Sequence, residues 1–250
     1  MSSDILIAET LDAGVQRLTM NRPERLNALN HPLAEALLAH FEGLRRNTEV
    51  RVVIVRGAGR AFSSGADLKA SGTPEALRDG PNGDWVLRDL MKAVRACPQP
   101  VIATVRGAAA GGGMALALAC DVVIASESAA FHPAFINIGL SGSELGVAWR
   151  LQRAIGLSKA RETLLAGRPL LAPAALETGL VSTVTSEEGL DEAGLTLARE
   201  MTRASPDALR ITKRTLDAAL EAPSYDAAME IEERGQMLMI RAGRVAAAKA

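Results

Sequence analysis

The sequence predicts a layered α/β fold followed by a helical tail. Three short apolar runs, each bounded by polar residues, are typical of strands buried on both faces of a parallel sheet. They cover residues 51–55, 101–105 and 121–125. Segments with helical periodicity separate these runs, as expected for helices layered on a sheet. The chain has 250 residues, 48% of them hydrophobic, and is long enough to bury a full core.

The chain begins with a predicted hairpin and a predicted helix. Residues 5–8 and 15–20 have strand-like patterns and flank the turn sequence 12–14. Asn30 is a good N-cap residue, and the apolar stripe that follows it predicts a helix to about Arg46.

The central part of the chain alternates helices and buried strands. Residues 70–84 contain two clusters of Gly, Ser, Pro and Asn and are expected to form a loop insertion. A helix is predicted at 85–96 before the strand at 101–105, and another at 114–119 before the strand at 121–125.

The last part of the sequence contains helical patterns and no strand pattern. Amphipathic helices are predicted to start near residues 190, 206 and 225. We therefore divide the chain into an α/β core at 1–189 and a helical region at 190–250. The apolar faces of these helices either contact other copies of the chain or fold back on its own core.

Composition and charge exclude several classes of protein. The formal net charge of −1 gives no global basic field for nucleic acid or an anionic membrane. Cys97 and Cys120 lie in no metal-ligand or CxxC spacing and are expected to be reduced thiols. Residues 1–11 do not resemble a signal peptide, and the apolar stretch 107–120 is too short to span a bilayer. We expect a cytoplasmic protein without a bound metal.

Two glycine-rich segments, 62–69 and 105–113, follow predicted buried strands. Ligands of α/β proteins bind at such carboxyl ends. The three glycines 111–113 stand at a helix start, where free N–H groups carry the positive end of the helix dipole. A carbonyl oxygen that becomes negative during a reaction would be stabilised there, and removing one such donor costs about 3 kcal/mol.

The two glycine-rich segments also have other interpretations. A glycine-rich turn before a helix often serves only close packing. Nucleotide binding is disfavoured because neither GxGxxG nor GxxxxGK[ST] occurs. A serine nucleophile at Ser64 or Ser141 is disfavoured because the sequence has no GxSxG elbow.

Taken together and in this order, the motifs resemble the crotonase (enoyl-CoA hydratase/isomerase) superfamily. The resemblance covers nearly the whole chain and is specific to the superfamily rather than to one reaction. The matching segments are 21–29, 62–68, 107–113, 119–121 and 139–140. The resemblance implies a ββα spiral with two nearly perpendicular sheets and a C-terminal helical trimerisation region. A homotrimer or a dimer of trimers is therefore expected.

The resemblance also implies a site for an acyl-CoA thioester. The backbone N–H groups of Ala66 and Gly112 would form an oxyanion hole for the thioester carbonyl and stabilise its enolate. Coenzyme A would enter as part of the substrate, with no tightly bound cofactor. The implied coenzyme A contacts are Arg25, Ala28, Ser64, Ala66, Asp67, Leu68, Lys69 and Lys213. The alternatives are a solvated surface charge for each lysine and a bracing hydrogen bond in the turn for Asp67.

The sequence departs from the family at both positions where typical hydratases carry a catalytic glutamate. Ala115 and Phe135 occupy these positions, so a mechanism with two carboxylates is in doubt. Glu144 is an alternative acid/base, which a dry pocket would favour by raising its pKa. The competing interpretation is that Glu144 caps a helix. His132 is the second candidate, with packing as its alternative role.

Three functions remain open at this point. The protein is a lyase or isomerase that uses Glu144, a hydrolase or C–C bond enzyme that uses His132 or Glu144, or a non-catalytic acyl-CoA-binding protein. The acyl chain is not identified by the sequence. Several aromatic residues either line its pocket or fill the core, namely Phe62, Trp85, Phe131, Phe135 and Trp149.

Overall fold

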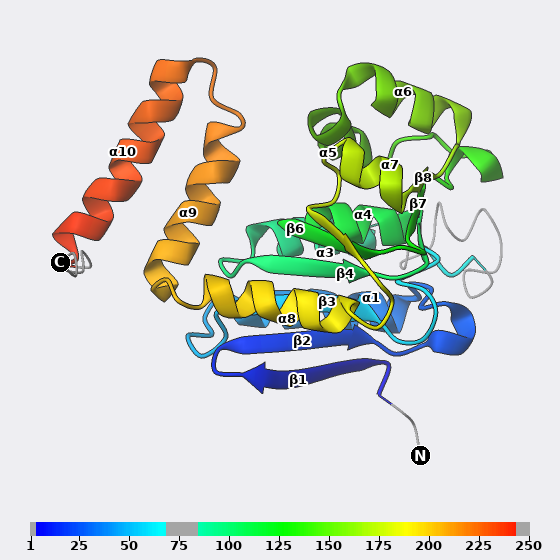
Figure 1. Ribbon diagram of the computed structural model, residues 1–250, viewed down its shortest axis with the longest axis horizontal. Coiled ribbons are helices and arrows are strands. Elements are labelled where there is room, and N and C mark those ends of the chain that lie inside the picture. The colour runs from blue at the N-terminus through cyan, green and yellow to red at the C-terminus, as the bar shows by residue number, and fades with distance from the viewer. Residues whose placement is uncertain (1–3, 69–84, 244–250) are drawn as a thin grey trace.

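The computed structural model describes residues 4–68 and 85–243 and has two sheets covered by helices (Figure 1). Lys69 and the predicted loop insertion at 70–84 lie outside these residues. The strands are β1 (Leu6–Asp12), β2 (Val15–Met20), β3 (Val52–Gly57), β4 (Val101–Val105), β5 (Ala108–Ala110), β6 (Val122–Ser126), β7 (Ala130–His132), β8 (Leu170–Leu171) and β9 (Thr183–Thr185).

The helices fall between and after these strands. The first group is η1 (Pro23–Arg25), α1 (His31–Leu44), α3 (Trp85–Ala96) and α4 (Gly112–Ala119). The second group is η2 (Ile136–Ile138), α5 (Val147–Ile155), α6 (Leu157–Ala166) and α7 (Ala172–Glu177). The last group is α8 (Leu190–Met201), α9 (Pro206–Ala219) and α10 (Tyr225–Arg241).

The larger sheet has the strand order β1-β2-β3-β4-β6-β9. Strands β1 and β2 pair as the predicted antiparallel hairpin, and the remaining neighbours are parallel. The smaller sheet has the order β5-β7-β8. The predicted mixed α/β class is therefore confirmed.

The large sheet is buried on both faces, which explains its continuous apolar strands. On one face, Val55 pairs with Ala103, and both belong to the main core under α1, α3 and α4. On the other face, Ile54 pairs with Ile102, and both pack against α8. Alternate residues of each strand thus face two separate cores.

The three predicted C-terminal helices form, but they are not equivalent. Helix α8 covers β3, β4 and β6, so it does not separate from the core. Helices α9 and α10 contact each other and extend away from the sheets (Figure 1). The domain boundary placed at residue 190 stays a prediction. Among the described residues, no helix combines the length and the apolar character that crossing a bilayer requires.

Candidate active site

The two glycine-rich segments lie side by side in the structure. Ser63 and Ala109 form a parallel bridge. The N–H of Ser63 donates to the carbonyl oxygen of Ala108 at 3.0 Å, and the N–H of Ala110 donates to the carbonyl oxygen of Ser63 at 2.9 Å. A Cβ on Gly113 would lie 2.4 Å from that same Ser63 oxygen. The close approach of the two turns therefore requires glycine at this position.

The amide of Ala66 is left available by the pairing of its neighbours. Leu29 bridges to Ala66 by donating to the carbonyl oxygen of Gly65 at 2.7 Å and accepting from Asp67 at 3.1 Å. These bonds turn the N–H of Ala66 to the opposite side, where it donates to no acceptor among the described residues. Gly112 is the first residue of α4, so its N–H has no partner within the helix.

The structure brings these two amides together. A Cβ on Gly112 would lie 3.6 Å from the nitrogen of Ala66, and a Cβ on Gly65 would lie 3.1 Å from the nitrogen of Gly112. Gly111 has φ of 50° and ψ of −117°, a conformation that side chains disfavour. Its own N–H donates to the carbonyl oxygen of His132 at 2.9 Å. The available pair is therefore Ala66 and Gly112.

This arrangement can stabilise an oxyanion. Every residue of α4 is buried, so water screens its positive N-terminus weakly. Donors fixed by strand pairing need no rearrangement when negative charge develops, which is what makes such a site effective.

Glu144 lies just before α5 and is half-buried. Helix α5 has Gly146 as its N-cap and no capping hydrogen bond from a side chain, so the structure does not support the helix-cap alternative. The next residue, Leu145, has a φ of 52°, a left-handed conformation that costs roughly 1–3 kcal/mol for such a residue. Strained backbone of this kind clusters at functional sites.

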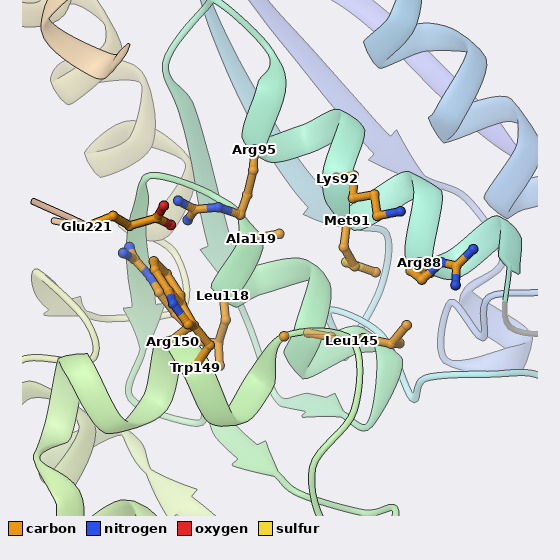
Figure 2. A pocket seen from close by; sticks show the side chains of 12 residues that line it. Arg88, Met91, Lys92, Arg95, Leu118, Ala119, Leu145, Trp149, Arg150 and Glu221 are labelled. Atoms are coloured by element: carbon orange, nitrogen blue, oxygen red, sulfur yellow. The ribbon is translucent and has the colours of Figure 1, made fainter. Parts of the chain in front are cut away.

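A mostly apolar pocket, here called the acyl pocket, opens between α3, α4 and α5 (Figure 2). Its volume is about 430 Å³. Ala115, in the first turn of α4, and Leu145 both line it. Its full lining is Arg88, Met91, Lys92, Arg95, Ala115, Leu118, Ala119, Leu145, Gly146, Trp149, Arg150 and Glu221.

The two positions without a hydratase glutamate are apolar and buried. Ala115 is 2% exposed and Phe135 is 7% exposed. A Cβ on Gly111 would lie 3.6 Å from the Phe135 ring, so the ring packs over the triple-glycine turn. Phe62 and Phe131 are core residues at 0% exposure.

A second groove of about 560 Å³, here called the cofactor groove, has Ala66 in its lining. It is lined by six of the predicted coenzyme A contacts, namely Arg25, Ala28, Ser64, Ala66, Asp67 and Leu68. Arg60 also lines it and was not predicted, although its place in the glycine-rich loop after β3 is a usable signal. Asp67 pairs with Arg22 at 3.0 Å, which supports its bracing role.

Lys213 does not line the cofactor groove, so its predicted contact with coenzyme A is corrected. Its side chain is 8% exposed, and its Nζ lies 2.8 Å from Oδ2 of Asp121 and 3.1 Å from the carbonyl oxygen of Gln99. A buried ammonium that is paired with the half-buried carboxylate of Asp121 is not available to a phosphate.

His132 supports the site mainly through its backbone. Its carbonyl oxygen accepts from the N–H of Gly111, and its half-buried position lowers the pKa of the imidazole. Burial raises the pKa of the Cys97 and Cys120 thiols, so neither is a reactive thiolate. No group of His, Cys, Asp and Glu suited to a metal occurs in the part of the chain that the structure describes.

Comparison with known proteins assigns the chain to a family. The family model described as enoyl-CoA hydratase/isomerase matches residues 10–243. The "Probable enoyl-CoA hydratase echA12" of Mycobacterium bovis is 41% identical over 231 residues, covering 90% of this chain and 81% of that protein.

Two solved structures show the same architecture. A monofunctional enoyl-CoA isomerase from M. smegmatis is 40% identical, with a TM-score of 0.78, covering 91% of this chain and 99% of that one. An enoyl-CoA hydratase from Bacillus anthracis is 31% identical, with a TM-score of 0.89, covering 95% of this chain and 92% of that one. The chain belongs to the enoyl-CoA hydratase/isomerase family of the crotonase superfamily, whose members act on acyl-CoA thioesters.

Proposed function

We propose that this family member is an enoyl-CoA isomerase that moves a double bond with one carboxylate, Glu144. The observation that carries this proposal is the pair of apolar, buried residues at the hydratase glutamate positions, Ala115 and Phe135. Ala115 lines the acyl pocket together with Leu145, the residue that follows Glu144. Hydration in the family uses two carboxylates to hold and split water. Double-bond migration requires only that one proton move between two carbons.

In the proposed reaction, the carboxylate of Glu144 removes the proton next to the thioester carbonyl of a β,γ-unsaturated acyl-CoA. The electron pair of that C–H bond moves toward the carbonyl oxygen, and the N–H groups of Ala66 and Gly112 hold the resulting dienolate. Glu144 then returns the proton to the γ-carbon. The negative charge collapses, and the α,β-unsaturated thioester forms without gain or loss of water.

The coenzyme A moiety is proposed to occupy the cofactor groove. Arg25 and Arg60 line this groove and offer planar guanidinium groups suited to phosphate oxygens. Ala28, Ser64 and Leu68 would contact the rest of the cofactor. Lys69 stays a predicted contact, since it follows the described part of the turn.

A homotrimer, or a dimer of trimers, remains our proposal for the assembly. Large apolar side chains on α9 and α10 are exposed, which supports their burial by other copies of the chain. These side chains are Leu216, Tyr225, Met229, Met237, Leu238 and Ile240. The free, buried cysteines support a reducing, cytoplasmic location.

The test is a pair of assays on the wild type and on Glu144→Gln. One assay follows conversion of a β,γ-unsaturated acyl-CoA to the conjugated thioester, and the other follows hydration of crotonyl-CoA. We expect the wild type to isomerise much faster than it hydrates, and Glu144→Gln to lose isomerisation while still binding an unreactive acyl-CoA. Glu177→Gln, an exposed glutamate on α7, is the matched control and should keep full activity.

The remaining outcomes separate the alternatives. Hydration as fast as isomerisation would refute the single-carboxylate proposal. Release of free coenzyme A would indicate a hydrolase. Tight acyl-CoA binding with no turnover in the wild type would indicate a non-catalytic binder.

A further inference from the structure

The acyl pocket is lined by apolar residues and by several positively charged side chains. Four of its lining residues are cations, namely Arg88, Lys92, Arg95 and Arg150, against a single lining carboxylate on Glu221. Three of these cations form ion pairs with carboxylates outside the lining, Arg88 and Lys92 with Asp89 and Arg95 with Asp217. Among the described residues, the positive charge that no such pair offsets is therefore centred on Arg150.

Some of these positively charged side chains lie far from the backbone amides of Ala66 and Gly112. The pocket follows α4 from Ala115 through Leu118 to Ala119. Since an α-helix rises about 1.5 Å per residue, Ala119 lies about 10 Å along the axis from Gly112. Figure 2 shows Arg95, Arg150 and the carboxylate of Glu221 gathered with Trp149 at one end of the pocket, and Leu145 away from them.

Arg150 has bonding capacity left at this end of the pocket. Its Nη2 lies 3.3 Å from the carbonyl oxygen of Asp121, and no carboxylate of the described residues forms an ion pair with it. Arg95, in contrast, pairs with Asp217 at 2.7 Å. A guanidinium has five N–H donors in a fork that matches a carboxylate, so most donors of Arg150 have no acceptor among the described residues.

A purely aliphatic tail does not explain this arrangement, because it would remove water from Arg150 and offer no hydrogen bond in return. An aromatic tail stacked on Trp149 does not explain it either. The guanidinium carbons of Arg95 and Arg153 already lie 4.9 Å and 4.1 Å from the centroid of that ring.

We propose that the acyl pocket selects acyl chains that end in a carboxylate, and that Arg150 binds this terminal group. The inference rests on the proposed function, since it takes the thioester carbonyl to lie at the amides of Ala66 and Gly112. An extended chain advances about 1.2 Å per bond, as three backbone bonds span roughly 3.6 Å. The distance of about 10 Å to the end of α4 therefore suits a chain of about eight bonds.

The test measures the binding of two saturated, unreactive ligands by calorimetry on the full-length protein. Octanoyl-CoA and suberyl-CoA have the same chain length and differ in the terminal carboxylate. We expect the wild type to bind suberyl-CoA about tenfold more tightly, as one charge-assisted hydrogen-bonded pair provides. Arg150→Gln should remove this preference and leave octanoyl-CoA affinity nearly unchanged.

Two further variants control for folding and for general electrostatics. Arg153→Gln removes an arginine three residues away on the same helix, outside the lining of the acyl pocket, and should keep the preference. Arg150→Lys should keep part of it because the charge remains.

The outcomes distinguish this inference from the function on which it rests. Equal binding of both ligands by the wild type, or an undiminished preference in Arg150→Gln, would refute the role of Arg150 while leaving acyl-CoA binding intact. A wild type that binds neither ligand would overturn the proposed function as well.

Discussion

Replacing Gly112 with alanine separates the chemistry of the site from the stability of the fold. A Cβ at this position would meet only ordinary contacts, 3.5 Å from Cδ1 of Leu29 and 3.6 Å from the nitrogen of Ala66. Gly112 opens α4, where alanine is a better helix former by up to about 1 kcal/mol. The fold should therefore tolerate Gly112→Ala or gain slightly from it.

The proposed reaction should not tolerate the same change. An oxyanion needs donors about 2.7–3.1 Å away, and a methyl group 3.6 Å from the Ala66 nitrogen takes space beside that donor. Losing the geometry of one donor costs roughly 3 kcal/mol in the transition state. We expect turnover in the isomerase assay to fall roughly 100- to 1,000-fold, with an unchanged or higher melting temperature.

Gly113→Ala is the matched comparison, because its Cβ would lie 2.4 Å from the backbone oxygen of Ser63. Forcing the two turns apart should destabilise the protein by about 1–3 kcal/mol or more. Melting temperatures and isomerase turnover measured on both variants test this prediction. A Gly112→Ala protein that keeps wild-type turnover would refute the assignment of this amide as an oxyanion donor.

Lys213→Met should lower the free energy of unfolding by about 2 kcal/mol, because it leaves the half-buried carboxylate of Asp121 without its cation. Adding Asp121→Asn should recover part of that loss, as measured by denaturant unfolding. If the effects of the two substitutions on the free energy of unfolding simply add, the two side chains are not coupled. Arg60→Gln should raise KM for acyl-CoA with little change in kcat, and an unchanged KM would exclude Arg60 from the cofactor site. Burial lowers the pKa of His40, so the unfolded chain binds its proton more readily than the native state does. Stability should therefore fall as the pH drops below about 6.5. Melting temperatures at a series of pH values check this, and His40→Gln should reduce the dependence.

Much of the architecture could be predicted from the sequence because its signals are local. The continuous apolar runs identified β3, β4 and β6, and these strands are buried on both faces. The positions of the glycine-rich segments predicted that the amides of Ala66 and Gly112 follow the ends of buried strands. The exact start of α4 was missed by two residues, since a helix of glycines and alanines begins without a recognisable cap.

The parts that the sequence could not predict depend on distant partners. Helical periodicity shows that α8 has an apolar face, but the same pattern fits a face against the sheet or against another subunit. A lysine in a sequence is most simply interpreted as a surface charge until its partner is known. The ion pair between Lys213 and Asp121 forms only in the folded chain. The place of Arg60 in the glycine-rich loop after β3 marks it as a candidate, but its role depends on the groove that folding creates.

The apolar residues at the two hydratase glutamate positions, Ala115 and Phe135, are better explained as one adaptation of the site than as two separate losses of a carboxylate. An alanine at position 115 removes a carboxylate and also lines the acyl pocket, so the space of a hydratase acid becomes room for substrate. Phe135 packs over the triple-glycine turn, and its apolar ring offers no hydrogen bond to the water that hydration would need. If Glu144 serves as the single acid, as proposed, a site with these apolar residues disfavours adding water and favours moving a proton within the substrate. The apolar replacements are therefore part of the argument for isomerisation.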